Sequence, residues 1–118
     1  MIVFVFGSNS QGIHGAGAAG YAVEHFGAIM GQGEGLQGAS YALPTMEGWE
    51  SLVSAVARFL VFALENPSMT FQVTRIGTGI AGWSDEEVAS LFQSAPENCQ
   101  FSSVWLPWLP DREVWTDL

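Results

Sequence analysis

The stretch "FGSNSQGIHGAGAAG", residues 6–20, decides how this sequence is interpreted. It follows the continuous apolar run "IVFVF" at residues 2–6, which predicts a buried strand covered on both faces. Closely spaced glycines and a single histidine, His14, come directly after that strand. Because glycine weakens both strands and helices, its repeated use here predicts either a tight turn or a ligand that lies against the backbone.

Strands and helices alternate along the first half of the chain. Apolar residues at helical spacing predict a helix over residues 15–26. The glycine-rich residues 27–38 predict a connector, either an irregular loop or a poor hairpin, before a short strand at 39–45. A sustained i, i+3, i+4, i+7 pattern then predicts an amphipathic helix from Glu47 to the Asn66-Pro67 pair.

The second half continues the alternation. Residues 69–77 predict a strand that leads into a second glycine loop, "GTGIAGW" at 77–83. Ser84 and Glu87 have the spacing of a capping box and predict the start of another helix. Residues 101–108 predict a last strand, and residues 110–118 a peripheral surface segment. The whole pattern predicts one α/β domain over 1–118, with a mostly parallel sheet flanked by helices.

Composition narrows the functional classes. The chain has 118 residues, of which 48% are hydrophobic, and its formal charge is −9 with no lysine. An acidic chain with so few basic residues is not expected to bind nucleic acid or an anionic membrane surface. No signal or membrane-spanning segment is recognised, so we expect a cytoplasmic protein. Cys99, the only cysteine, predicts a small buried strand residue rather than a disulfide or zinc ligand, and no metal or cofactor is expected.

The two glycine loops both follow predicted strands. In open α/β sheets ligands bind beyond the carboxyl ends of the strands, where backbone N–H groups at turns and helix starts can hold an anion without lysine. Gly15, Gly17 and Gly20 match a dinucleotide-binding spacing, but the acidic residue that this motif needs about twenty residues later is not clear, because Glu34 lies in a glycine-rich loop rather than after a second strand. A Rossmann-like nucleotide-processing enzyme therefore stays an alternative interpretation.

Taken in order, these features resemble the macro domain, a family that binds ADP-ribose and in some branches hydrolyses ADP-ribosyl linkages. "VFVFGSNSQGIHGAGAA" resembles the family's asparagine-ended strand, glycine loop and first helix; "SYALPT" resembles its next short strand; and "FQVTRIGTGIAGWSDEEVASLF" resembles its later strand, phosphate-binding loop and helix. The match covers roughly residues 2–105. It implies a three-layer macro-like fold, in a compact divergent member of the kind found in bacteria and their phages.

The resemblance also implies a binding site. Asn9 would lie by the distal ribose, Gly15 and Gly17 near the ribose and diphosphate, and the loop from Gly77 to Gly82 would wrap the diphosphate. The full set of expected ligand-binding residues is Gly7, Ser8, Asn9, Gly12, Gly15, Gly17, Gly77, Thr78, Gly79, Ile80, Ala81, Gly82 and Trp83. Asn9 and His14 are the candidate catalytic residues, each of which could help to position a water molecule against the anomeric carbon.

Structural roles compete with these functional ones. Asn9 could merely stabilise a turn, His14 could satisfy a backbone carbonyl, and Trp83 could be a core lid. The acidic residues 85–87 are better explained by the first turn of a helix than by catalysis.

The sequence therefore predicts a protein that binds ADP-ribose or a related ribonucleotide diphosphate and, if it is an enzyme, hydrolyses an ADP-ribosyl linkage. A non-catalytic nucleotide reader or sponge, a Rossmann-like enzyme and a structural interaction module are the alternatives. Trp105, Trp108 and Trp115 either form an exposed patch that joins copies of the chain into a homo-oligomer, or fold back onto the sheet.

Overall fold

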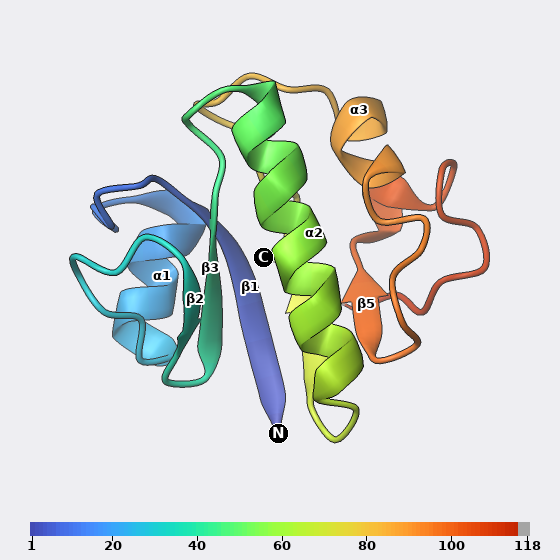
Figure 1. The fold of residues 1–118 in the computed structure, drawn as a ribbon, viewed down its shortest axis with the longest axis horizontal. Coiled ribbons are helices and arrows are strands. Elements are labelled where there is room, and N and C mark those ends of the chain that lie inside the picture. Colours follow the sequence, from blue (N-terminus) through green and yellow to red (C-terminus); the bar gives the residue numbers. More distant parts are fainter. Residues whose placement is uncertain (116–118) are drawn as a thin grey trace.

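A computed structural model describes residues 1–115 and shows a five-stranded sheet in the order β2-β3-β1-β4-β5 (Figure 1). The central strand is β1 (Ile2–Ser8), with β3 (Ser40–Pro44) and β4 (Thr70–Val73) parallel to it on either side. At one edge β5 (Cys99–Phe101) runs parallel to β4, and at the other β2 (Gly35–Gln37) runs antiparallel to β3. The predicted mostly parallel α/β sheet is confirmed.

Helices cover both faces of the sheet. The short helix α1 (Gly17–His25) lies on one face, and α2 (Trp49–Glu65) and α3 (Asp85–Ser90) lie on the other (Figure 1). Side chains of β1 alternate between the two resulting cores, as the period of a strand requires. Val3 and Val5 join the α2 side, whereas Phe4 and Phe6 join the α1 side. The predicted three-layer arrangement is therefore confirmed.

The amphipathic helix and the capping box predicted from the sequence are both present in the structure. The apolar stripe of α2 buries Leu52, Val56 and Phe59, which lie on its sheet-facing side. The capping box at the start of α3 forms as expected, because Ser84 Oγ accepts from the Glu87 amide and the Glu87 carboxylate accepts from the Ser84 amide. Within residues 1–115 no helix combines the length and apolarity needed to cross a bilayer.

Two predicted segments differ in the structure, and a third follows one of the alternatives that the sequence left open. The strand expected over 69–77 is confined to β4: Thr74 still donates to Val5 O through its amide and its hydroxyl, but the chain then turns, with the Ile76 amide donating to Thr74 O. The glycine-rich connector ends in a hairpin of β2 and β3, which is one of the two alternatives predicted for it. The last strand is β5, not 101–108, because Ser102 caps a short 3-10 helix, η1 (Ser103–Trp105).

The C-terminal tryptophans fold back onto the molecule. Trp105 is fully buried in the core on the α2 side, and Trp108 packs against that core. Trp115 lies edge-on to Phe4, and its indole N–H donates to Val73 O at 3.0 Å. Backbone pairing with Phe101 adds this segment to the edge of the sheet. Residues 110–115 thus lie along the edge of the sheet, with Trp115 half-buried and Asp111, Glu113 and Val114 exposed, and residues 116–118 lie outside the described residues.

Candidate functional site

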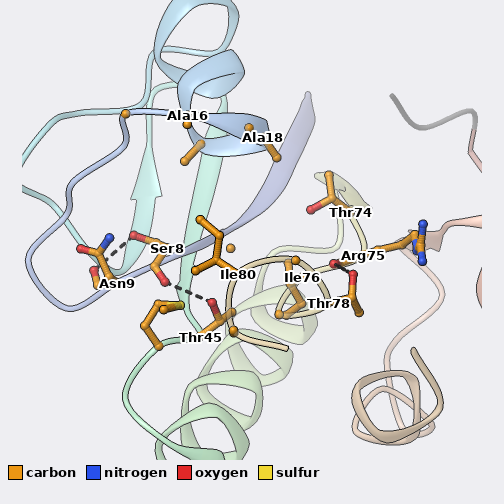
Figure 2. A pocket seen from close by; sticks show the side chains of 18 of the residues that line it. Ser8, Asn9, Ala16, Ala18, Thr45, Thr74, Arg75, Ile76, Thr78 and Ile80 are labelled. Atoms are coloured by element: carbon orange, nitrogen blue, oxygen red, sulfur yellow. Dashed lines mark hydrogen bonds between the residues drawn. The ribbon is translucent and has the colours of Figure 1, made fainter. Parts of the chain in front are cut away.

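One large cavity opens at the carboxyl ends of β1, β3 and β4, with a volume of about 870 Å³ (Figure 2). Its walls come from the end of β1, the loop and first turns of α1, Thr45 and Met46 after β3, and the loop after β4. Parallel strands on both sides of β1 all point their carboxyl ends here, which is where open α/β sheets bind ligands. The topology therefore brings together the two glycine loops that the sequence singled out.

Most of the predicted ligand-binding residues lie at this cavity. The structure places these at its wall: Gly7, Ser8, Asn9, Gly15, Gly17, Gly77, Thr78, Gly79, Ile80 and Ala81. It does not bring Gly12, His14, Gly82 or Trp83 to the wall. Sequence reasoning missed Ile13, Ala16, Ala18, Ala19, Tyr21, Thr45, Met46, Thr74, Arg75 and Ile76. The two threonines carried a usable signal, since each directly follows a strand of the parallel sheet.

The glycines of the two loops serve two different purposes. A Cβ added at Gly15, Gly17 or Gly79 would meet no atom within 4 Å, so these positions border open space. A Cβ at Gly12 would instead collide with the backbone of Gly31 and Gln32. Gly12, expected to bind ligand, is therefore a packing glycine where two connectors cross, with a φ of 69° that itself favours glycine.

The first turn of α1 presents unpaired backbone donors at the cavity. Its N-cap, Ala16, has no side chain that could accept a hydrogen bond, and no acidic residue lies in the first turn. The amides of Gly17, Ala18 and Ala19 donate to no acceptor among residues 1–115, whereas the Gly20 amide bonds Ala16 O. Such a helix start favours an anion, because its N–H groups and the helix dipole act together.

The loop after β4 supplies a second set of donors. Its base is secured by hydrogen bonds from the Trp83 amide to Gly77 O and from Thr78 Oγ1 to Arg75 O. At its tip the amides of Gly79, Ile80 and Ala81 have no acceptor in the described part of the chain. The Ile80 side chain is 91% exposed and extends into the space facing α1 and Ser8 in Figure 2.

The cationic side chain of Arg75, which the structure places at the wall, forms an ion pair with Asp85. Arg75 forms two hydrogen bonds with Asp85, at 2.9 Å from Nε and 2.8 Å from Nη2, and its guanidinium points away from Ser8 and Asn9 (Figure 2). Asp85 also accepts from Trp105 Nε1 at 2.7 Å. The Arg75 hydrogen bonds, assisted by Trp105, hold the pKa of Asp85 below its usual value. This network fixes the loop after β4 to α3 and η1.

Asn9 lies at the wall, but its side chain stabilises its own loop. Its Oδ1 accepts from the Ile13 amide at 3.0 Å, and its Nδ2 donates to Ile13 O at 3.1 Å. One proton on Nδ2 and one lone pair on Oδ1 are still available to a ligand. The turn-stabilising role weighed in the sequence is thus present, and it orients the amide at the edge of the cavity.

His14 lies behind the wall rather than in it. The ring is only 2% exposed, packs edge-on against Phe6, and places Nε2 at 2.9 Å from Gln32 O. Its Nδ1 lies 3.5 Å from Oγ of Ser8, which is a wall residue. Of the ring contacts that His14 makes with Phe6, Ser8 and Gln32, the one to Ser8 is with a wall residue.

Trp83 and Cys99 belong to the core. Trp83 packs edge-on against Trp49, at the start of α2, and its buried indole N–H has no hydrogen-bond partner in residues 1–115. Cys99 is buried in β5, as predicted, and burial raises the pKa of its thiol to about 12 despite the nearby Arg112. Among the described residues no group of three or more His, Cys, Asp or Glu side chains could hold a metal ion.

Comparisons of the chain with protein-family models, with curated proteins and with solved structures gave no match. The resemblance to the macro domain accordingly stays a prediction. What the cavity can bind is inferred from its own geometry.

Proposed function

We propose that the cavity binds ADP-ribose or a related ribonucleotide diphosphate. The observation that carries this proposal is two sets of backbone amides that line the cavity and have no acceptor among residues 1–115: Gly17 to Ala19 at the start of α1, and Gly79 to Ala81 at the tip of the loop after β4. Backbone N–H groups arranged in this way hold phosphate oxygens at strand ends and helix starts in many α/β proteins.

Because the chain is acidic, we expect backbone N–H groups rather than charged side chains to bind an anion. With a net charge of −9 and Arg75 held by Asp85, side chains offer an anion little attraction. The dipole of α1 is equivalent to roughly half a positive charge at its start. A diphosphate bound by such groups gains hydrogen bonds from backbone N–H donors, which do not titrate.

The remaining wall suits the ribose and base of a nucleotide. The wall also includes Ser8, Thr45 and Thr74, which carry hydroxyls, together with the aliphatic side chain of Ile13 and the aromatic ring of Tyr21. Cavities of about 300–1,000 Å³ with an apolar lining and a few polar groups are typical of small-molecule sites. A volume of about 870 Å³ therefore accommodates a ligand larger than a mononucleotide.

Between binding alone and hydrolysis, the contacts favour binding. Hydrolysis of an ADP-ribosyl linkage needs a group that positions or deprotonates water. Both amide atoms of Asn9 already hold the backbone of Ile13, and His14 is separated from the cavity by Ser8. An ADP-ribosyl hydrolase is the second candidate, supported by the position of Asn9 at the wall, and a nucleotide reader or sponge is the simpler activity.

Isothermal titration with ADP-ribose, AMP, NAD and cyclic ADP-ribose tests the proposal. We expect saturable binding of ADP-ribose by the wild type and a loss of at least about tenfold in affinity for Gly79→Glu, which places a carboxylate among the tip amides. Gly79 has no neighbour within 4 Å of an added Cβ, so the variant should fold. Ala57→Glu, on the exposed face of α2, adds the same charge away from the cavity and should bind normally.

Other outcomes select among the alternatives. Heat-silent titrations with every nucleotide would rule out the proposal and favour a structural module. Release of a free base from NAD or AMP would favour a Rossmann-like nucleotide-processing enzyme. Incubation with an ADP-ribosylated peptide, followed by mass spectrometry, separates the two leading candidates, because only the hydrolase frees the peptide.

A further inference from the structure

The arginines nearest to the cavity are already bound to carboxylates. The chain has three arginines, two histidines and no lysine, and every arginine and histidine lies within residues 1–115. Of these side chains the structure places Arg75 at the wall, where two of its nitrogens bond the Asp85 carboxylate at 2.8 and 2.9 Å. Arg58 binds Glu34 in the same bidentate way, at 2.6 and 2.8 Å. Both positive charges are thus balanced before a ligand binds.

The histidines and Arg112 do not line the wall. His14 is 2% exposed, and both of its ring nitrogens have polar partners. His25 is the last residue of α1, whose first turn is the part that meets the cavity, and Arg112 donates to Gln93 O. In the part of the chain that the structure describes, an anion in the cavity therefore meets backbone donors and the dipole of α1, and the cation at the wall is paired with a carboxylate.

Carboxylates lie next to both loops that line the cavity. Glu47, in the connection between β3 and α2, accepts from the Ser10 amide of the first loop at 3.0 Å. The second loop leads into α3, whose first turn contains Asp85, Glu86 and Glu87. The chain as a whole has a net charge of −9. Such surroundings penalise each negative charge that a ligand brings beyond what the donors can balance.

The donors at the wall form two sets of three, which suits two singly charged phosphates. One set is the amides of residues 17–19 and the other is the amides of residues 79–81. Each phosphate of a diphosphate that is esterified at both ends carries one negative charge. A terminal phosphate carries close to two at neutral pH, because its second proton dissociates near pH 6. A terminal phosphate therefore adds a charge that no unengaged cation at the described wall balances.

We propose that the cavity selects, by charge, diphosphates that are esterified at both ends and rejects nucleotides that end in a free phosphate. The inference rests on the proposed function and narrows its ligand class. ADP-ribose belongs to the accepted class, whereas AMP, ADP and ATP belong to the rejected one. Selection arises because the amides balance one charge on each phosphate, while the second charge of a terminal phosphate faces an acidic protein without a cationic partner.

Two ligands that differ only in a terminal ester isolate this charge. ADP and its β-methyl ester share the base, the ribose and the diphosphate, but the ester lacks the second negative charge on the outer phosphate. Competition with ADP-ribose, followed by calorimetry without divalent cations, measures both affinities against one reference. At about pH 7.5 we expect the ester to bind at least about fivefold tighter than ADP.

The same comparison at lower pH separates charge from shape. Near pH 5.5 most of the ADP carries a singly charged terminal phosphate, whereas ADP-ribose and the methyl ester keep their charge. The preference for the ester should therefore fall below about twofold, because the two ligands then carry nearly the same charge. A preference that came from contacts of the added methyl group would not change with pH.

Ile80 is a position at which the missing cation can be supplied. Its side chain is 91% exposed and extends into the space facing α1 and Ser8 (Figure 2), so a lysine there displaces no core side chain. Ile80→Lys should narrow the preference for the ester to roughly twofold at about pH 7.5, because the ammonium pairs with the additional charge of ADP. Ala57→Lys adds the same charge on the exposed face of α2 and should keep the wild-type preference.

The outcomes distinguish this inference from the proposed function. Suppose that ADP-ribose binds but the ester binds no better than ADP at about pH 7.5, including the case in which neither displaces ADP-ribose. The inference is then wrong and the proposed function stands. A preference that is unchanged near pH 5.5, or unchanged in a folded Ile80→Lys protein, also overturns the inference. Absence of ADP-ribose binding overturns both. The wild-type comparison decides the matter by itself should Ile80→Lys fail to fold.

Discussion

At the scale of single residues, glycines in similar loops have two different roles: some border the cavity and others allow backbone segments to pack closely. Gly15 and Gly79 border the open cavity, whereas Gly12 and Gly33 allow two connectors to cross at backbone contact. A Cβ at Gly33 would collide with the carbonyls of Asn9 and Ser10. Sequence spacing does not distinguish these duties, because both sets lie in glycine-rich loops and only the tertiary crossing separates them.

Because of this difference, we expect a glycine-to-alanine substitution to destabilise the protein more at Gly12 and Gly33 than at Gly15. Gly12→Ala and Gly33→Ala should each lower the free energy of unfolding by about 2–4 kcal/mol, since the colliding atoms are backbone and cannot rotate away. Gly15→Ala, which meets no atom and lies outside the left-handed region, should change it by less than about 1 kcal/mol. Urea denaturation measures all of these values. Equal destabilisation by the three variants would contradict the assignment of duties.

The carboxylate of Asp85 holds the loop after β4 in place through its hydrogen bonds with Arg75. Its pKa lies below the ordinary value of 3.8, chiefly because Arg75 hydrogen-bonds the carboxylate and secondly because Trp105 does. A carboxyl with a lowered folded pKa stabilises the fold fully above its ordinary pKa. That contribution disappears as pH falls from the ordinary value through the folded one.

Asp85→Asn should therefore destabilise the protein at neutral pH, by about 1–3 kcal/mol, because Arg75 loses its charged partner. The difference between variant and wild type should shrink as pH falls below about 4. Thermal unfolding over a pH series measures this convergence. Asp111→Asn removes the same charge at an exposed position and should follow the wild type. A gap that stays constant down to about pH 2 would show that Asp85 does not act through its charge.

At the scale of elements, helices were predicted well and the ends of strands were not. The apolar period of α2 and the capping box of α3 are local signals, and both formed as expected. The strand expected over 69–77 stopped at Val73, because the chain turns just after Thr74, where the Ile76 amide donates to Thr74 O at 2.7 Å. The β-branched and aromatic residues after Phe101 became η1 because the hydroxyl of Ser102 accepts from the Val104 amide. Such contacts depend on neighbours that a linear pattern does not show.

The segment that ends at Trp115 acts as an additional edge of the sheet. Trp115→Ala should lower the free energy of unfolding by about 2 kcal/mol, because it uncovers Phe4 and removes the bond to Val73 O. Trp115→Phe keeps an aromatic ring and should lower the free energy of unfolding by only about 1 kcal/mol. Chemical denaturation compares the two variants. If Trp115→Ala left the free energy of unfolding unchanged, the segment would be the surface tail that the sequence predicts.

At the scale of the whole molecule, sheet order creates the site. Placing β3 and β4 on either side of β1 brings the loops after all three strands to one end of the sheet (Figure 1). The sequence predicted that the two glycine loops meet there, because alternating strands and helices favour a parallel sheet. It missed Tyr21 and Met46 at the wall, since their positions depend on how α1 and the β3–α2 connection approach the cavity.

The proposed function depends on whether the amides of two loops, which have no acceptor among residues 1–115, hold a diphosphate. A two-dimensional amide NMR titration of the wild-type protein with ADP-ribose, after backbone assignment, tests this. We expect the amide signals of Gly17, Ala18 and Ala19 and those of Gly79, Ile80 and Ala81 to shift together and to saturate at one ligand concentration, with amides on the exposed face of α2 unmoved. Shifts confined to other surfaces, or no saturable shift at either loop, would contradict it.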